Sequence, residues 1–578
     1  MTIFSGAISL QPNQALPAAL LDGLRQSLTR SNVDQQVEAS STGFFVTKVD
    51  IGAFGAPAFR HDGNGSVTVV AGEPLMRDGE DDAGWNRARD VELLHALLDG
   101  GDTDGLRRCR GTFCGLHFNA GSNSLRLFVD QMGVRPLYLW VGPEFAVFST
   151  ALRVIEALPL IPKHFDVRGV AEISAFNFPL SDRTAYLGVT MLKSGQMVTI
   201  EQGKAVRSFH SRWDGAIDTE TPYATTVDNA YTQFIKAIAR RHRNKKVAAA
   251  FLSGGLDSRV IVGGLHANGS DVHTVNYAPD GSQDQVFAAL VAKQLGINYT
   301  QIETNAENVG QGYRKDAVGK WLKATFANAN ENAPLVWSGD GGSVALGHVY
   351  MTGDIVSAMQ AGDVARAIAL FTTGVPPRIL TRESRAVIAK LPMTGIQEEL
   401  NDIVSADKGR QFHLFLMLND QRRHLARHFE DIDVDRIEFQ LPFFDGDFLE
   451  SVLRLPNQPL MFHNFYMDWL ALFPNRLNAI PWQAYPGHVP CHVPSPPGLK
   501  YQWEEYYDKK MYRQMRHSTT KLGVGMLTDA RFPRHILSRT SLAAAVLLTR
   551  LGVADYSYLI NTASTFHRYW KNQGPQTS

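Results

Sequence analysis

The sequence predicts a two-domain α/β protein in which stacked sheets are followed by a doubly wound parallel sheet and a helical C-terminal part. At 578 residues the chain is long for a single hydrophobic core. Up to about Gln202, short alternating strands are separated by Gly, Asn and Asp turns. Beyond that point, apolar strand patterns alternate with helical patterns, as a doubly wound sheet requires.

The front half contains several short strands, and we expect them to form sheets packed face to face. The clearest are Ser66–Ala71, Phe113–Phe118 and Leu125–Val129. We expect a first domain over residues 1–205, a linker over 206–225 and a second domain over 226–578.

Composition argues against several classes of partner. Lys+Arg 57 balance Asp+Glu 57, so the chain has no overall electrostatic attraction for nucleic acid or an anionic membrane. The three cysteines include no Cys-x-x-Cys pair and are too few for a disulfide framework. No basic leader precedes a long apolar stretch, and the apolar block Leu542–Leu548 is too short to span a bilayer. We therefore expect a soluble, cytoplasmic protein without nucleic-acid or membrane partners.

One segment carries the clearest chemical signal. Val247–Leu252 is a continuous apolar run typical of a buried parallel strand, and Ser253-Gly254-Gly255-Leu256-Asp257-Ser258 follows it directly. The two glycines allow backbone N–H groups to approach an anion, and the N-terminus of the following helix adds its positive dipole. Hydroxyls from the serines can donate to phosphate, and Asp257 can bind a bridging Mg²⁺. A Gly-Gly pair alone would indicate only a tight turn.

This six-residue string resembles the pyrophosphate loop of ATP pyrophosphatases, which cleave ATP between its α and β phosphates. It is not a Walker A loop, because no Gly-Lys-Ser/Thr follows. The resemblance implies ATP and Mg²⁺ as cofactors, with Asp257 as the metal ligand. The residues that we expect to contact the nucleotide are Leu252, Ser253, Gly254, Gly255, Leu256, Asp257, Ser258 and Val275.

The pattern after this loop continues the parallel sheet. Asp271–Tyr277 is predicted as the next strand and Asp284–Leu295 as the helix that packs on it. Ligands of such sheets bind outside the carboxyl ends of the strands. We therefore expect adenine near Leu252 and the Val275–Tyr277 edge.

The stretch Cys109–Trp140 is similar to part of the class II glutamine amidotransferase domain, a sandwich of αββα type. The family's Gly-x-Phe strand and Asp-x-x-Gly-x-x-Pro-Leu-Tyr segment are matched by Gly111, Phe113, Asp130, Gly133, Pro136, Leu137 and Tyr138. A glutaminase fold followed by a pyrophosphate loop is the domain order of asparagine synthetase, and the chain resembles that family over most of its length.

The front domain departs from that family at its catalytic positions. Thr2 stands where the family has its nucleophilic cysteine, and Ala71-Gly72 replaces an Asn-Gly pair of the oxyanion hole. Asp90 still resembles the residue that holds the substrate's α-amine. We therefore expect a degenerate glutaminase, as in β-lactam synthetases and lasso-peptide cyclases.

The segment Leu335–Gly347 resembles the second active-site loop of this family. By this resemblance Ser338 and Gly339 contact the nucleotide and Asp340 handles the proton of the attacking amine, while Ser343 replaces a magnesium-binding aspartate. The family's catalytic lysine has no close match, because no lysine occurs between Lys408 and Lys500. Lys500 is the nearest candidate.

Arg436–Pro456 resembles a further family segment. Gln440 stands there in place of an arginine, and Asp445 is predicted to be a helix N-cap.

The function that we expect is an AMP-forming amide synthetase, which activates a carboxylate as an acyl adenylate for attack by an amine. Three alternatives remain open at this point: an ordinary asparagine synthase that uses glutamine or ammonia, a ring-closing synthetase, and a nucleotide-binding scaffold without turnover. The expected partners are small-molecule or peptide carboxylates and amines, with a homodimer or biosynthetic-cluster proteins as further candidates.

Overall fold

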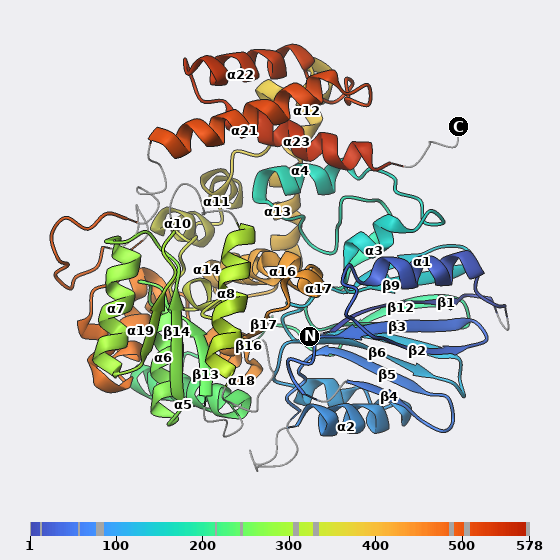
Figure 1. Cartoon of the computed structure of the whole chain (residues 1–578), viewed down its shortest axis with the longest axis horizontal. Coiled ribbons are helices and arrows are strands. Elements are labelled where there is room, and N and C mark those ends of the chain that lie inside the picture. Colours follow the sequence, from blue (N-terminus) through green and yellow to red (C-terminus); the bar gives the residue numbers. More distant parts are fainter. Residues whose placement is uncertain are drawn as a thin grey trace.

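The structure is a computed structural model, and it describes residues 2–11, 14–55, 58–76, 86–213, 215, 217–242, 247–304, 311–327, 335–484, 490–501 and 509–573. A sandwich of two sheets lies beside a smaller parallel sheet, and a layer of helices lies across the top of both in the view of Figure 1. Within the described residues, no helix has both the length and the apolar character needed to cross a membrane.

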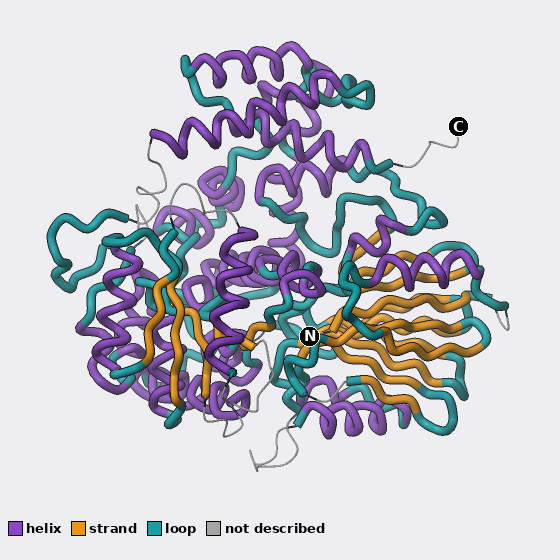
Figure 2. Tube along the Cα trace, viewed as in Figure 1, coloured by secondary structure: helices purple, strands orange, loops and turns teal. Residues whose placement is uncertain are grey.

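The front half is an antiparallel sandwich of two six-stranded sheets (Figure 2). The first sheet has the order β10 (Val189–Met191), β8 (Tyr138–Val141), β9 (Phe145–Ser149), β1 (Thr2–Ser9), β3 (Phe44–Asp50) and β2 (Gln36–Ser41). The second has the order β12 (Lys204–Phe209), β11 (Gln196–Glu201), β7 (Ser124–Val129), β6 (Phe113–Asn119), β5 (Val67–Gly72) and β4 (Phe59–His61). The predicted strand 66–71 is thus observed one residue later, and the other two predicted strands are confirmed within β6 and β7.

Helices cover both outer faces of the sandwich, which confirms the αββα arrangement. Contacts to the first sheet come from α1 (Ala18–Leu28) and α3 (Leu152–Ala157), and contacts to the second come from α2 (Arg87–Asp99). Between the sheets, alternate strand residues such as Phe4, Val46 and Leu116 are buried in one apolar core.

The back half contains a five-stranded sheet in which every recorded strand pair is parallel. Its order is β15 (Asn298–Gln301), β14 (Asp271–Asn276), β13 (Val247–Phe251), β16 (Leu335–Trp337) and β17 (Glu438–Gln440). The chain winds outward from β13 in one direction and then returns to add β16 and β17 on the other side. This doubly wound order was predicted, and the first two predicted strands each end one residue earlier than expected.

Helices surround this sheet and continue into the C-terminal part (Figure 1). The first helices of the back half are α5 (Tyr223–His242), α6 (Asp257–Ala267), α7 (Gln283–Leu295), α8 (Gln311–Phe326) and α9 (Gly342–Ala345). The next are α10 (Gly353–Gln360), α11 (Val364–Phe371), α12 (Arg382–Ile388), α13 (Leu391–Asp402), α14 (Lys408–Leu416), α15 (Arg422–His424), α16 (Ala426–Glu430) and α17 (Ile432–Asp435). The last are α18 (Gly446–Leu453), α19 (Asn464–Leu470), α21 (Lys509–Thr528), α22 (Arg539–Leu551) and α23 (Ser557–Lys571).

Short helical turns complete the secondary structure. They are η1 (Asp104–Arg108), η2 (Pro377–Ile379), η3 (Met417–Gln421), η4 (Pro442–Phe444), η5 (Gln458–His463) and η6 (Pro474–Ala479).

The two halves are joined by more than the connecting chain. Helix α23 packs on α4 (Val167–Phe176) of the front half, and the rings of Phe165 and Trp570 lie 5.5 Å apart. The C-terminal helices therefore return to the first half of the sequence. Strand β12 ends at Phe209 and helix α5 begins at Tyr223. The segment that connects the two halves therefore lies between Phe209 and Tyr223.

Buried polar contacts also cross the interface between the halves. Arg135 Nη2 lies 2.9 Å from Glu438 Oε1, and both side chains are about fully buried, at 1% and 0% exposure. Gln440, the residue in place of the family's arginine, donates from Nε2 to Glu73 Oε2 at 2.8 Å. Asp445 accepts from the backbone N–H groups of residues 447 and 448, which confirms the predicted N-cap of α18.

Candidate active site

Two loops meet at the carboxyl edge of the parallel sheet, where the winding direction changes. One follows β13 and leads into α6, and the other follows β16 and leads into α9. Such a switch point is the usual ligand site of an open α/β sheet. The loops touch backbone to backbone, because a Cβ added at Gly339 would lie 2.7 Å from the Ser258 nitrogen. Glycine is therefore required at position 339 by close approach.

The first loop is held in shape by its own serines. Ser258 Oγ accepts from the Ser253 backbone N–H at 2.9 Å and lies 2.9 Å from Ser253 Oγ. The Gly255 N–H donates to Ser253 Oγ at 3.2 Å, whereas the Gly254 N–H donates to Asp284 Oδ1 at 2.9 Å. The serine hydroxyls and the Gly255 N–H are thus the donors that this loop can redirect to an anion, while the Gly254 donor is engaged within the fold.

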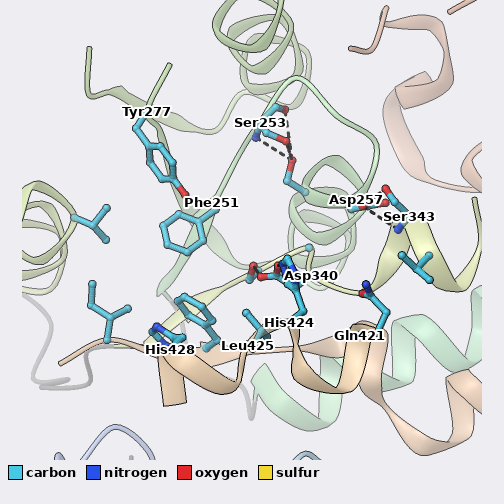
Figure 3. Close-up of a pocket in the computed structure, with 18 of the residues that line it drawn as sticks. Phe251, Ser253, Asp257, Tyr277, Asp340, Ser343, Gln421, His424, Leu425 and His428 are labelled. Carbon is cyan, nitrogen blue, oxygen red and sulfur yellow. Dashed lines mark hydrogen bonds and ion pairs between the residues drawn. The ribbon is translucent and has the colours of Figure 1, made fainter. Parts of the chain in front are cut away.

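Asp257 begins α6 and connects the two loops (Figure 3). Its Oδ2 accepts from the Ser343 backbone N–H at 3.0 Å and from Ser343 Oγ at 2.5 Å, and its Oδ1 accepts from Tyr466 Oη at 2.8 Å. Burial raises the pKa of this carboxyl to about 6, even though all three hydrogen bonds favour the charged form. Three donors thus fix the orientation of Asp257.

Asp340, in the second loop, pairs with a histidine that the sequence did not single out. His424 Nε2 lies 3.4 Å from Asp340 Oδ1, and Ser338 Oγ donates to Asp340 Oδ2 at 2.5 Å. The hydrogen bond to Asp340 raises the pKa of His424. Burial opposes ionisation of Asp340, but the contacts with His424 and Ser338 together lower its pKa below the ordinary value. The result is an aspartate–histidine pair that faces open space.

These groups line one cavity of about 520 Å³. Figure 3 shows Asp257, Ser343 and Gln421 at one end, and Tyr277, Phe251 and His428 at the other, with Asp340 and His424 between them.

The second end of the cavity is a row of rings. Phe251 packs edge-on against Tyr277 at 5.9 Å and against Phe439 at 5.7 Å, and Phe439 stacks on His428 at 3.9 Å. Beside this row, Lys315 Nζ lies 2.5 Å from Asp435 Oδ1. Among the described residues that line the cavity, Lys315 is the one lysine or arginine, and its charge is paired.

The structure separates the predicted nucleotide residues into two groups. Ser253, Asp257, Ser258, Ser338, Gly339 and Asp340 line the cavity. Others support the loops from outside the cavity wall: Leu252, Gly254, Gly255, Leu256 and Val275. The Leu252 N–H donates to the Val275 carbonyl at 3.0 Å, which joins two of these supporting residues.

Lys500 lies outside the cavity wall as well. Its side chain is exposed, and its carbonyl oxygen accepts from the Gln283 N–H at 2.9 Å, next to the first loop. Its catalytic role stays a prediction.

Sequence reasoning missed Gln421, His424 and Tyr466. Gln421 and His424 lie at and just after a π-helical turn, Met417–Gln421, an irregularity that often marks functional sites but has no sequence signature. Tyr466 reaches Asp257 from α19, more than 200 residues later in the chain.

The residues present fit a magnesium ion brought in by a nucleotide. Mg²⁺ is commonly bound by one or two carboxylates together with substrate phosphates and water. Asp257 supplies one carboxylate, and Ser343 supplies no charge at the position where the family pattern has a second aspartate, as the sequence predicted. Within the described part of the chain, no cluster of three or more His, Cys, Asp or Glu side chains could hold a metal by itself.

The positions predicted to be degenerate in the glutaminase lie near one another, among buried charged side chains. Thr2 is paired with Asp50 across β1 and β3, and Ala71 and Gly72 end β5. Arg87 Nη1 lies 3.0 Å from Asp50 Oδ2, and its Nε donates to the Gly72 carbonyl at 2.9 Å.

Two more buried charged side chains, Arg135 and Lys48, lie in the same region. Arg135 crosses Gly72 so closely that a Cβ there would lie 2.3 Å from Arg135 Nε. Lys48 Nζ lies 3.3 Å from Asp50 Oδ2, and burial lowers the pKa of this lysine to about 7. Asp90 is buried in the first turn of α2, near Arg87.

The fold and the cavity define an α/β protein of the ATP-pyrophosphatase type, preceded by a glutaminase-like sandwich. A glutamine amidotransferase domain model matches residues 76–213, and an asparagine synthase model matches residues 230–330. Both matches occur in the order that the sequence predicted. The chain is therefore similar to the asparagine synthetase family in both matched segments, as its sequence motifs predicted.

Three relatives are similar over part of their length. Carboxyethyl-arginine beta-lactam-synthase of Streptomyces clavuligerus is 27% identical over 244 residues, which cover 41% of this chain and 44% of the relative. Putative asparagine synthetase [glutamine-hydrolyzing] 2 of Methanocaldococcus jannaschii is 26% identical over 46% of this chain and 54% of its own length. Asparagine synthetase [glutamine-hydrolyzing] 3 of Bacillus subtilis is 24% identical over 41% and 39%. The matched segments thus span about half of each relative or less.

Proposed function

We propose that this protein is an ATP-dependent carbon–nitrogen ligase that forms an amide through an acyl adenylate. The observation that carries the proposal is the single cavity that joins Ser253, Asp257 and Ser258 of one loop to the Asp340–His424 pair. The first group suits the phosphates of Mg-ATP, and the second suits the proton transfer that amide formation requires. The asparagine synthase match and the names of the relatives support the same class of reaction.

In the first step, a substrate carboxylate oxygen attacks the α-phosphorus of ATP, and the bond from that phosphorus to the β-phosphate bridging oxygen breaks. Pyrophosphate leaves, and the acyl adenylate forms. Serine hydroxyls 253 and 258 would hold phosphate oxygens, and Asp257 would hold the magnesium ion. When bound, Mg²⁺ supplies charge neutralisation for the phosphates.

In the second step, an amine nitrogen attacks the acyl carbon, and the carbon–oxygen bond to AMP breaks. The nitrogen must lose a proton as the amide forms. With its Nε2–H directed at Asp340, neutral His424 has a lone pair on Nδ1 that can accept this proton. Asp340 holds the tautomer and stabilises the imidazolium that results, as the aspartate of a catalytic triad does.

Two observations shape the choice of substrates. An ordinary asparagine synthase must bind the α-carboxylate of aspartate, but the one lysine or arginine among the described lining residues, Lys315, is already paired with Asp435. The row of rings at the same end favours a substrate with an apolar body. Thr2, in place of the nucleophilic cysteine of the family, favours an amine that does not come from glutamine.

A ring-closing synthetase is the second candidate. The similarity to a beta-lactam-synthase and the Thr2 position favour it, because such an enzyme uses an amine that its substrate already carries. A product whose mass equals that of the substrate minus water, formed without an added amine, would identify this version of the activity.

The direct test is exchange of labelled pyrophosphate into ATP, with Mg²⁺ and a panel of aspartate, apolar amino acids, sugar acids and peptides. Exchange that depends on one carboxylate and is lost in Asp257→Asn would support adenylation. Silence across the panel from protein that binds ATP would instead favour the non-catalytic scaffold.

A second measurement separates the two steps. His424→Gln is expected to retain pyrophosphate exchange but to lose about 10²–10⁴-fold in amide formation, the range typical of general acid–base groups. His164→Gln is the matched control, because that histidine is exposed and lies outside the cavity wall. Equal loss of both steps in His424→Gln would contradict the assigned role.

A further inference from the structure

A second cavity, of about 440 Å³, lies between the two halves, and it shares no residue with the cavity described above. Its wall comes from η1, the segment after β12, α14 and α18, so both halves contribute to it. Five arginines line it: Arg107, Arg110, Arg212, Arg410 and Arg454. Glu450 is the one carboxylate among the described lining residues.

Three of these five arginines have carboxylate partners in the chain, and only Glu450 among those partners lines the cavity. Arg454 pairs with Glu450, Arg110 pairs with Asp447, and Arg107 Nε lies 3.8 Å from Asp104 Oδ1. The fully buried Arg410 donates instead to the Leu455 carbonyl and contacts His413 Nδ1 at 2.5 Å. Burial lowers the pKa of Arg410, yet at about 10 it remains charged at neutral pH. An excess of guanidinium groups around a hollow is a suitable environment for an oxyanion.

Two buried polar atoms in the same wall have no hydrogen-bond partner within the described structure. They are Ser405 Oγ and His210 Nδ1, in residues that are 8% and 5% exposed. The other ring nitrogen of His210, Nε2, lies 2.8 Å from the Val129 carbonyl and must carry the hydrogen of that bond. His210 Nδ1 is therefore an acceptor, and burial lowers the pKa of the ring, which keeps it neutral.

We propose that this cavity is a binding site for a phosphate group. The arginines would donate to the phosphate oxygens, Ser405 would donate its hydroxyl, and a P–OH hydrogen would be donated to His210 Nδ1. Sulfate has similar size and charge but carries no hydrogen at neutral pH, so His210 discriminates against it. The ligand contacts both halves at once, and its binding stabilises their association.

Isothermal titration calorimetry on the full chain, with inorganic phosphate and sulfate at constant ionic strength, tests the site. Phosphate is expected to bind at least tenfold more tightly than sulfate. Arg107→Gln and Arg454→Gln should each weaken phosphate binding about tenfold, because each removes a charged donor. Both side chains are more than half exposed, at 63% and 62%, so these variants should fold normally.

The control is the Ser253→Ala/Ser258→Ala double variant, in which the first loop loses its hydroxyl donors. Phosphate binding that survives in this control but weakens in the arginine variants would support the second site. Binding that is lost in the control and unchanged in the arginine variants would overturn it, as would equal affinity for phosphate and sulfate.

A second comparison identifies the source of the phosphate group. Glycerol 3-phosphate that binds more tightly than inorganic phosphate would indicate a phosphate ester, and the reverse order would indicate the free ion. Either result supports the site, and neither depends on whether the protein forms amides.

Discussion

The region around Asp50 in the front domain and the cavity around Asp257 both hold buried charged groups, but they arrange them differently. In the front domain, Arg87 and Lys48 both lie against Asp50, and Arg135 lies against Glu438. In the cavity, Asp257 and Asp340 are also hydrogen-bonded, and they line about 520 Å³ of open space. Buried charge therefore does not by itself mark an active site. What separates the two regions is that the front-domain carboxylates pair with buried cations of the chain, whereas Asp257 accepts from neutral donors at the wall of a cavity.

The largest effect should come from breaking a charge pair where no ligand can replace the lost partner. Arg135→Met leaves Glu438 buried without its cation, and we expect a loss of about 3–5 kcal/mol in the free energy of unfolding. Urea unfolding measures it. Arg135→Met/Glu438→Leu should recover most of the loss, because removing both charges is often nearly neutral. A loss below about 1 kcal/mol in the single variant would mean that water reaches this pair.

Adding a charge to the open cavity should instead change ligand binding. Ser343→Asp places a second carboxylate beside Asp257, as the family pattern has it, and we expect the Mg²⁺ concentration for half-maximal pyrophosphate exchange to fall about tenfold. The neutral variant Ser343→Asn is the matched control. An unchanged Mg²⁺ requirement in Ser343→Asp would show that residue 343 does not face the metal.

The open cavity should also respond to pH. Asp257 must be ionised to bind Mg²⁺, and its pKa is about 6. We therefore expect exchange activity to fall about tenfold between pH 7 and pH 5, because the ionised fraction falls from about nine-tenths to one-tenth.

Ser343→Ala provides the control for that pH profile. It removes a hydrogen bond that lowers the pKa of Asp257, so the acid limb should move to higher pH. If the acid limb does not move, a group other than Asp257 causes the fall in exchange activity at low pH.

The last effect concerns Lys48, which lies beside Asp50 in the front domain. Its pKa of about 7 lies below the ordinary 10.5, so the folded protein binds fewer protons here than the unfolded chain between pH 7 and 10. Stability contributed by this residue should therefore rise with pH over that window. The free energy of unfolding of Lys48→Met, minus that of wild type at the same pH, should therefore be larger at pH 6 than at pH 9. Chemical unfolding at the two pH values measures the difference, and a difference of opposite sign would refute the assignment.

Local sequence signals predicted much of the fold. The apolar run before Ser253, the following strand and its helix were each found within one residue, because a buried parallel strand leaves a continuous apolar pattern. Asp445 was predicted as an N-cap from its place before a helical pattern, and the structure confirms it. These features depend on residues that are close together in the sequence, so a local sequence pattern can predict them.

The sequence by itself determined the two-domain α/β architecture, the two loops and the changed residues Thr2, Ala71 and Ser343. Only the tertiary structure decided which side chains meet: His424 with Asp340, Tyr466 with Asp257, and arginines 87 and 135 with the front-domain interior. The physical reason is that these contacts join residues far apart in the chain. Their geometry depends on how sheets and helices pack, and no local pattern of residues records that packing.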